Sequence, residues 1–118
     1  MAAGRQLQQS RLPLQPAPMY LVREITYCKP GKVRPMVERS LKMAKLMEEN
    51  GQGKMRIMTD FVAQQYWMIV CEYETEKLDT MMSMDGVSPE VMKQMDEIMQ
   101  GYHEFVDHGK REIFKIEG

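Results

Sequence analysis

The order of apolar and polar residues between positions 19 and 117 predicts strand, helix, strand, strand, helix and strand. Alternating apolar, β-branched and aromatic positions predict strands over 19–27, 54–62, 65–73 and 111–117. Apolar residues recurring at intervals of three and four predict helices over 33–50 and from Pro89 to about His108, with a short helix or turn over 74–84. This order favours an α+β fold, a four-stranded antiparallel sheet with both helices on one face.

Residues that begin and end elements support these boundaries. Ser88 before Pro89 is typical of a helix start, with serine as the N-cap and proline at the first helical position. Asn50 with Gly51 ends the first helix, and Gly109 is predicted to end the second. Ala63-Gln64 is a short connection, so the strands that flank it should pair antiparallel.

Alternation within the strands sorts their side chains onto two faces of the sheet. The set predicted to face the helices is Leu21, Ile25, Tyr27, Met55, Ile57, Phe61, Trp67, Ile69, Cys71, Tyr73, Phe114 and Ile116. The set predicted to face away is Tyr20, Val22, Glu24, Thr26, Arg56, Met58, Asp60, Tyr66, Met68, Val70, Glu72, Ile113 and Lys115. A slip of one residue in any strand would exchange the two sets for that strand.

The second face mixes apolar and charged residues, and no part of the chain is predicted to cover it. It is too apolar to stand in water over a whole sheet and too charged for an ordinary core. Two copies placed face to face would satisfy both constraints, because the same surface is buried on each copy around a partly polar cavity. The pattern therefore predicts a homodimer with a cavity at the sheet face.

Composition limits the classes of function. With 118 residues the chain has room for one domain, predicted over 19–118. Its 16 basic and 17 acidic residues nearly cancel, so neither a nucleic-acid partner nor membrane insertion is expected. Two cysteines are too few for a disulfide framework, which predicts free thiols in the cytoplasm. Fourteen methionines fit either ordinary core positions or an adaptable binding surface, and no cofactor is predicted.

Residues 1–18 differ from the rest of the chain. They contain two arginines, three prolines and no acidic residue, with no sustained period, which predicts an irregular extension. Three interpretations remain open: a disordered tail, an arm that docks on another subunit and builds a higher oligomer, or part of a mitochondrial leader. A secretory signal is not expected, because there is no apolar segment of the required kind.

The candidate binding site lies on the face predicted to be uncovered. It comprises Glu24, Arg56, Asp60, Tyr66, Trp67, Met68 and Glu72. Two interpretations of the charged members stay open: ion pairs within the sheet or dimer, and recognition or acid–base chemistry on a small molecule. Trp67 fits either core packing or the wall of a substrate site.

Other chemical motifs are weak. Cys28 precedes Lys29, whose charge could lower the thiol pKa, although an inert thiol is the plainer interpretation. His103 and His108 are predicted at or just past the end of a helix, and a spacing of five does not place them on one face. The run Met81–Met84 could bind copper(I) through thioethers, but neither cysteine nor histidine accompanies it.

Three runs, Arg23–Lys32, Gly53–Asp60 and Trp67–Glu74, resemble the dimeric α/β-barrel superfamily, and its NIPSNAP-like branch in particular. The resemblance covers about residues 19–117, and the ending Cys28-Lys-Pro-Gly-Lys32 is its most specific part. It implies a ferredoxin-like subunit, a homodimer and a cavity for a small hydrophobic molecule, with no defined activity.

Small monooxygenases in that superfamily are expected to use an asparagine on the first strand, a tryptophan on the third and a nearby histidine. Trp67 matches the tryptophan, but the chain's only asparagine is Asn50, at a helix end. A cofactor-free or haem-dependent oxygenase, or an isomerase, therefore stays an alternative to a binding protein, as does an accessory subunit of a larger complex.

Overall fold

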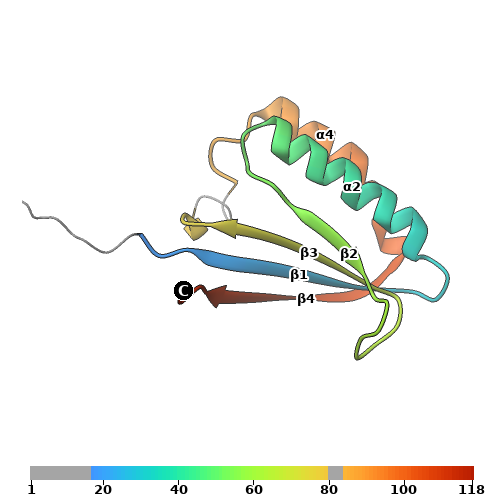
Figure 1. Cartoon of the computed structure of the whole chain (residues 1–118). Coiled ribbons are helices and arrows are strands. Elements are labelled where there is room, and N and C mark those ends of the chain that lie inside the picture. Colours follow the sequence, from blue (N-terminus) through green and yellow to red (C-terminus); the bar gives the residue numbers. More distant parts are fainter. Residues whose placement is uncertain (1–16, 80–83) are drawn as a thin grey trace, which may run out of the picture.

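The protein forms one sheet covered on one side by two helices (Figure 1). The computed structural model describes residues 17–79 and 84–118. Its elements are β1 (Tyr20–Cys28), α2 (Val33–Glu49), β2 (Arg56–Thr59), β3 (Met68–Thr75), α4 (Pro89–Met99), the short 3-10 helix η1 (Tyr102–Glu104) and β4 (Val106–Lys115). None of the helices in the described ranges is long and apolar enough to cross a membrane.

The strands lie in the order β2-β3-β1-β4, and all three neighbouring pairs are antiparallel. Because β1 and β3 lie in the middle, the first strand is hydrogen-bonded on both sides. Both helices lie against the same face, and none of residues 17–79 and 84–118 forms a second layer on the opposite face of the sheet (Figure 1). The fold class predicted from the sequence is confirmed.

The core lies between the sheet and the helices. Its buried residues are Cys28, Met36, Val37 and Ile69, and partly buried side chains from β2, α4, η1 and β4 pack against them. Met36, the methionine among these four residues, is 4% exposed, so it fills the core as a leucine would. The core is thin, as expected for a two-layer domain in which only one face of the sheet is covered.

The pairing of the strands corrects the predicted faces for β1 and β4. Residues directly opposite in antiparallel strands point to the same face. Thr26 is directly opposite Ile69, which belongs to the core between the sheet and the helices. The alternate residues of β1 that share this face, among them Val22 opposite Tyr73, therefore face the helices. The prediction that Leu21, Ile25 and Tyr27 face the helices is therefore wrong, as is the same prediction for Phe114, which is opposite Leu21.

The first helix agrees with the sequence pattern to within one residue. It ends at Glu49, where the Asn50 side chain donates to the carbonyl of Leu46 at 2.8 Å, and Gly51 follows with φ of 75°. That left-handed conformation is where glycine is favoured. Leu41, one of the apolar residues of this helix, is 54% exposed and lies outside the core.

The second long helix is much shorter than predicted. Ser88 caps it as expected, since its hydroxyl accepts a hydrogen bond from the Val91 N–H at 3.2 Å. The helix ends at Met99, and Gly101, with φ of 78°, turns the chain into η1. Strand β4 then begins at Val106, so His108 and Gly109 are strand residues. The prediction that Gly109 ends a helix is wrong.

The connection between β2 and β3 is longer than the predicted two residues. It spans residues 60–67 because β2 ends at Thr59 and β3 begins only at Met68. Phe61 and Trp67, predicted to face the helices, lie in this connection, and their exposed fractions are 99% and 43%. The chain hangs here on the side of the sheet away from the helices (Figure 1).

Two predictions fall largely outside the described ranges. Of the N-terminal extension, 1–18, only residues 17 and 18 are described, and of the methionine run only Met84 is described. The alternatives for the extension and the copper(I) interpretation of the run therefore stay predictions.

Candidate functional site

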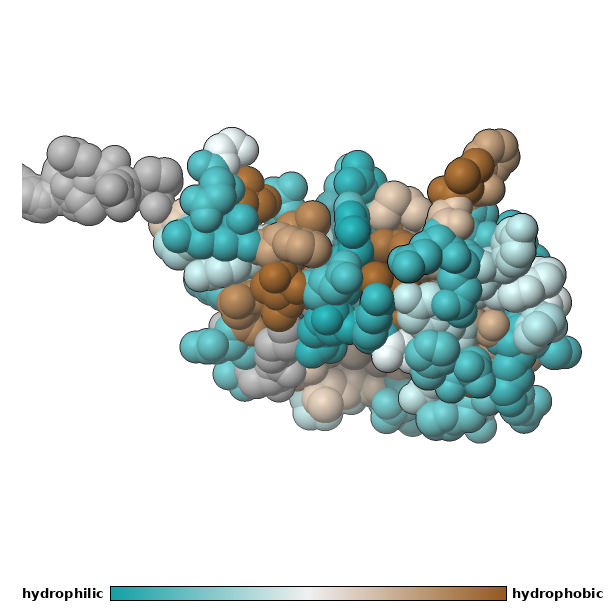
Figure 2. Space-filling model, turned by 90° about the horizontal axis from the view of Figure 1, so that it is seen from below, coloured by the Kyte–Doolittle hydropathy of each residue, from teal (hydrophilic) through white to brown (hydrophobic). Residues whose placement is uncertain are grey.

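We call the side of the sheet opposite the helices the bare face. The strand pairings place these side chains on it: Leu21, Arg23, Ile25, Tyr27, Arg56, Met58, Met68, Val70, Glu72, Glu74, His108, Lys110, Glu112 and Phe114. Figure 2 shows this face, with hydrophobic side chains on both sides of a hydrophilic band and a hydrophobic tip projecting beyond its edge. As predicted, the uncovered face carries both apolar and charged side chains, but several of its residues differ from those predicted to lie there.

Charged side chains of the bare face form a cluster around Glu72. Its Oε2 accepts from Arg23 Nη2 at 2.7 Å and Nε at 3.0 Å, and its Oε1 accepts from Arg56 Nη2 at 2.7 Å. Arg23 Nη1 also lies 3.7 Å from Oε1 of Glu112, on the other side of β1. The residue Glu72 is 6% exposed, and it is the one buried charged residue in the described ranges.

Hydrogen bonds from Arg56 and Arg23 lower the pKa of the Glu72 carboxyl, and its burial opposes them. The carboxylate is thus ionised at neutral pH and held as an acceptor of three N–H bonds. Arg23 was missed as a site residue because the adjacent Glu24 was assigned to this face instead. Arg23 and Glu24 are adjacent charged residues in the same strand, so the sequence alone does not indicate which of them lies on this face.

Glu24 does not join this group. It is opposite Cys71 and Arg111, on the side of the sheet that faces the helices, and its Oε2 accepts from Arg111 Nε at 2.6 Å. The prediction that Glu24 shares a face with Arg56 and Glu72 is wrong. The slip of one residue in β1 that the alternation left open accounts for this.

Three predicted site residues belong to the connection between β2 and β3. Asp60 follows β2 directly, and its Oδ1 accepts from the Met68 N–H at 2.8 Å, which ties the two ends of the connection together. Tyr66 is 79% exposed. Trp67 has φ of 65°, a conformation that costs a bulky residue energy, and its carbonyl accepts from the Cys28 N–H at 2.8 Å.

At this end of the sheet the aromatic groups lie close together. The rings of Tyr27 and His108 stack with centroids 4.5 Å apart, and Asp107 Oδ2 lies 2.8 Å from His108 Nδ1. Met68 is directly opposite Tyr27, so it lies on the bare face as predicted. A cavity of about 400 Å³ is lined here by Tyr27, Cys28, Lys29, Pro30, Gln65, Tyr66, Trp67 and Asp107.

A second cavity lies beside the Glu72 cluster. It has a volume of about 350 Å³ and is lined by Leu21, Lys54, Arg56, Glu72, Tyr73 and Glu74. Of the predicted site residues, this cavity brings together Arg56 and Glu72. The Arg56 side chain is 75% exposed and carries five N–H donors, of which Glu72 accepts from Nη2. Donors are therefore left for a bound molecule.

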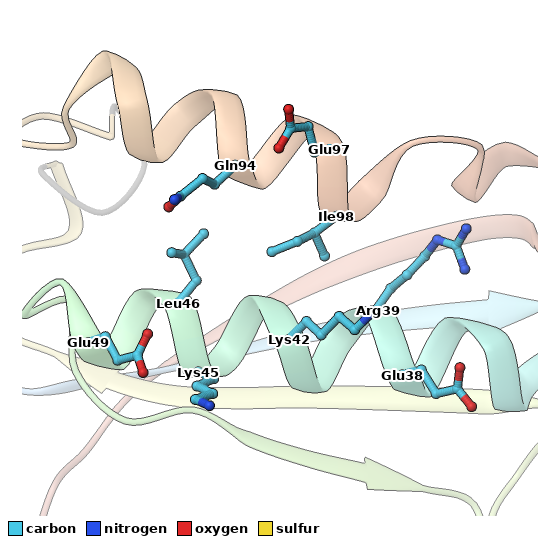
Figure 3. A pocket seen from close by; sticks show the side chains of 9 residues that line it. All are labelled: Glu38, Arg39, Lys42, Lys45, Leu46, Glu49, Gln94, Glu97 and Ile98. Atoms are coloured by element: carbon cyan, nitrogen blue, oxygen red, sulfur yellow. The ribbon is translucent and has the colours of Figure 1, made fainter.

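A larger cavity lies elsewhere, in the groove between α2 and α4. Its volume is about 630 Å³, and Leu46 and Ile98 point into the gap between the helices while charged side chains lie along its rim (Figure 3). Arg39 at one end has a structural role, since Nη2 donates to the Gln100 carbonyl at 3.2 Å and the guanidinium lies 4.6 Å from the Phe105 ring centroid. Because this open groove holds none of the predicted site residues, we place the candidate site on the bare face.

Neither thiol is set up as a nucleophile. Burial, and secondarily the charge of Asp60, raises the pKa of Cys28. The suggestion that nearby lysines lower it is wrong. Burial first, then the charges of Glu24 and Glu72, raises the pKa of Cys71 to about 12. Both groups are neutral thiols at physiological pH.

The described residues include no group of three or more histidine, cysteine or acidic side chains that could hold a metal ion. His103 lies in η1, where its ring is 4.0 Å from that of Tyr102, whereas His108 lies in β4. The two histidines are therefore on different elements.

The fold is similar to that of several solved structures. A NIPSNAP family protein of unknown function from Agrobacterium tumefaciens has a TM-score of 0.68 and 10% identity, over 85% of this chain and 89% of that one. An uncharacterized NIPSNAP-like domain protein from Burkholderia xenovorans has a TM-score of 0.60 and 12% identity, over 80% and 82% of the two chains.

A dimeric protein of unknown function with a ferredoxin-like fold, from Bacteroides fragilis, has a TM-score of 0.60 and 12% identity, over 83% of this chain and 96% of that one. No protein-family model matches the chain, and comparison with curated proteins gives no match. At this level of identity the likeness concerns the fold. The chain has the ferredoxin-like fold of NIPSNAP-like proteins, in agreement with the resemblance seen in its sequence.

Proposed function

We propose that two copies of the chain associate through their bare faces and bind a small molecule in the space between the sheets. The molecule has an apolar body and one hydrogen-bond acceptor group. The observation that carries the proposal is the Glu72 cluster, a paired carboxylate that is 6% exposed at the middle of a sheet face without a second layer.

The composition of the bare face supports association. Leu21, Met58, Met68 and Val70 lie on it, and Phe114 at its edge is 48% exposed. Burying exposed apolar surface between two copies would stabilise their association by roughly 25 cal/mol for each Å² removed from water. The charges of the Glu72 cluster are already paired within one copy, which reduces the cost of burying them. A protein of the same fold is described as dimeric.

The cavity beside Arg56 supports binding of a ligand. The Arg56 guanidinium has N–H donors that Glu72 does not use, and its Nη2 donates to Glu72 Oε1 at 2.7 Å. This bond holds the guanidinium in place, so it can bind an acceptor without losing its orientation. Leu21 contributes an apolar surface to the same cavity. A few fixed polar groups that set the orientation of a bound molecule are typical of small-molecule sites.

Native mass spectrometry of the purified protein tests the proposal. We expect a dimer that carries additional small-molecule mass, and we expect Arg56→Gln to remain a dimer but to lose that mass. Lys45→Gln, in the groove between the helices, is the matched control and should retain it. A monomer at micromolar concentration would refute the proposed dimer, and equal ligand loss in both variants would refute the assignment of Arg56.

A further inference from the structure

We propose that Phe61 and Val62, which we call the loop tip, dock on a second copy of the chain at the far end of its bare face. There they contact Leu21 and Phe114 and complete the wall of the partner's cavity beside Arg56. The inference deepens the proposed function, on which it rests, because it makes each binding site depend on residues of both copies.

The loop tip is the most exposed apolar feature of the described residues. Phe61 is 99% exposed and Val62 is 90% exposed, next to each other in the connection between β2 and β3. This connection hangs on the side of the bare face, and a hydrophobic tip projects past the edge of that face (Figures 1 and 2). Two adjacent large apolar side chains at a projecting position indicate a contact with another molecule.

A receiving surface lies at the opposite end of the same face. Leu21 and Phe114 are directly opposite each other across β1 and β4, and Ile116 beyond them is 36% exposed. The loop begins and ends near Tyr27, which is opposite Met68. From Leu21 to Tyr27 is six residues of strand, roughly 20 Å. One chain therefore cannot cover its own surface at Leu21 with its own loop tip.

Two-fold symmetry brings the two features together. If the sheets face each other with their strands antiparallel, each loop tip lies over the Leu21 end of the other copy, and the contact forms twice. With the strands parallel, both projecting loops would lie at the same end of the dimer, and neither would reach the Leu21 end of the other copy. The antiparallel arrangement is therefore the one in which each loop tip reaches that surface.

The contact would also finish the binding site. Four of the six residues that line the cavity beside Arg56 are charged, and Leu21 is its aliphatic member. The partner's Phe61 and the partner's Val62 would add the apolar surface that this lining lacks. The resulting site has a polar end at Arg56 and an apolar end supplied by the other copy.

Oxidative cross-linking tests the arrangement on the full chain. Phe61→Cys and Phe114→Cys proteins are mixed, exchanged and oxidised, and non-reducing electrophoresis shows the products. We expect a disulfide-linked dimer from the mixture and not from either variant alone, because the bond needs Cα atoms roughly 4.4–6.8 Å apart. Leu41→Cys, exposed on α2 on the other side of the sheet, mixed with Phe114→Cys is the control and should not link.

The outcomes separate this inference from the proposed function. Linking by Phe61→Cys alone would mean that loop tips meet each other, and it would overturn the inference while leaving the dimer. If light scattering shows that both variants are dimers but no disulfide forms between positions 61 and 114, the inference is likewise overturned and the dimer remains. A monomer would refute the proposed function itself.

A second measurement does not depend on introduced cysteines. The double variant Phe61→Ser, Val62→Ser should raise the dimer dissociation constant at least about 10-fold, with an unchanged circular dichroism spectrum because both side chains are exposed in one copy. Gln64→Ser in the same connection should leave it unchanged. The inference would be overturned if the double variant keeps the wild-type dissociation constant. If the wild type also binds phosphatidylcholine vesicles and the double variant does not, the loop tip is assigned to a lipid surface.

Discussion

Arg23 lies directly opposite Glu72 across β1 and β3, and its Nη2 is 2.7 Å from the Glu72 Oε2. Their Cα atoms belong to paired positions of the two central strands, so the ion pair is fixed by the register of the sheet. Arg56, opposite Glu72 on the other side, completes the cluster. One carboxylate thereby joins three strands, and the register of all three determines whether the cluster forms.

Replacing Glu72 tests how much the cluster stabilises the fold. Glu72→Gln leaves two neighbouring guanidinium groups without their shared carboxylate, and we expect the free energy of unfolding to fall by about 1–3 kcal/mol. Urea denaturation measures this change. The control is Glu74→Gln, which removes an exposed carboxyl from the same face of the same strand. A loss as small as the control's would show that the cluster does not stabilise the chain.

The same carboxyl gives an expected pH dependence. Its native pKa lies below the ordinary value of 4.5, so its stabilising contribution is fully present above pH 4.5 and is lost as the pH falls below that value toward the native pKa. Urea curves for the wild type and Glu72→Gln should therefore differ at neutral pH and converge in acid. Curves that stay equally far apart at all pH values would contradict the lowered pKa.

The thiols give a prediction about reactivity. With a pKa of about 12, Cys71 is roughly 0.01% thiolate at pH 8, against roughly 10% for a thiol at the ordinary value of 9.0. We expect iodoacetamide to alkylate Cys71 at least 100-fold more slowly in the native protein than in guanidinium chloride. Peptide mass spectrometry measures both rates. Rapid alkylation of the native protein would mean that this thiol is more accessible or more acidic than the structure implies.

Gly109 tests the close approach of β4 to β1. A Cβ added there would lie 3.0 Å from the backbone oxygen of Ile25, which is closer than a methyl group can approach without a shift of one strand. Gly109→Ala should therefore lower the free energy of unfolding by about 1–3 kcal/mol. At Gly118 an added Cβ meets nothing within 4 Å, so Gly118→Ala should have no effect. Equal stability of the two variants would contradict the pairing of β4 at this position.

The sequence predicted the class of fold because its periodicities and helix signals are strong. Ser88 with Pro89 marked the start of α4, and the spacing of Met36, Val37 and Met47 marked the buried side of α2, where each is at most 5% exposed. Such signals arise from contacts within a few residues. They do not depend on how the strands pair.

The faces of β1 could not be predicted in the same way. Both of its alternating sets contain apolar residues, and each contains one charged residue, Arg23 in one and Glu24 in the other. As a strand paired on both sides, β1 buries Val22 on the helix side and Ile25 on the bare face, with exposed fractions of 0% and 6%. Only its pairing with β3 distinguishes the two sets, and pairing is not encoded by local alternation.

The start of β4 was misassigned for a related reason. Its first half, Val106 to Arg111, is polar and includes a glycine, which is typical of a helix end and not of a strand. The segment is extended because β1 offers paired positions along its length, from Tyr20 opposite Lys115 to Tyr27 opposite His108 and, after a shift in register, Cys28 opposite Val106. Tertiary pairing overrides the local preference here.

The position of Trp67 gives the molecule a reporter of its own. It is the only tryptophan of the chain, and it lies 43% exposed in the connection that carries the loop tip. Ultraviolet excitation at the red edge of the spectrum would therefore produce emission from this one indole alone. A shift of that emission toward shorter wavelength with rising protein concentration would follow the covering of this end of the sheet in real time, with no dye or label attached.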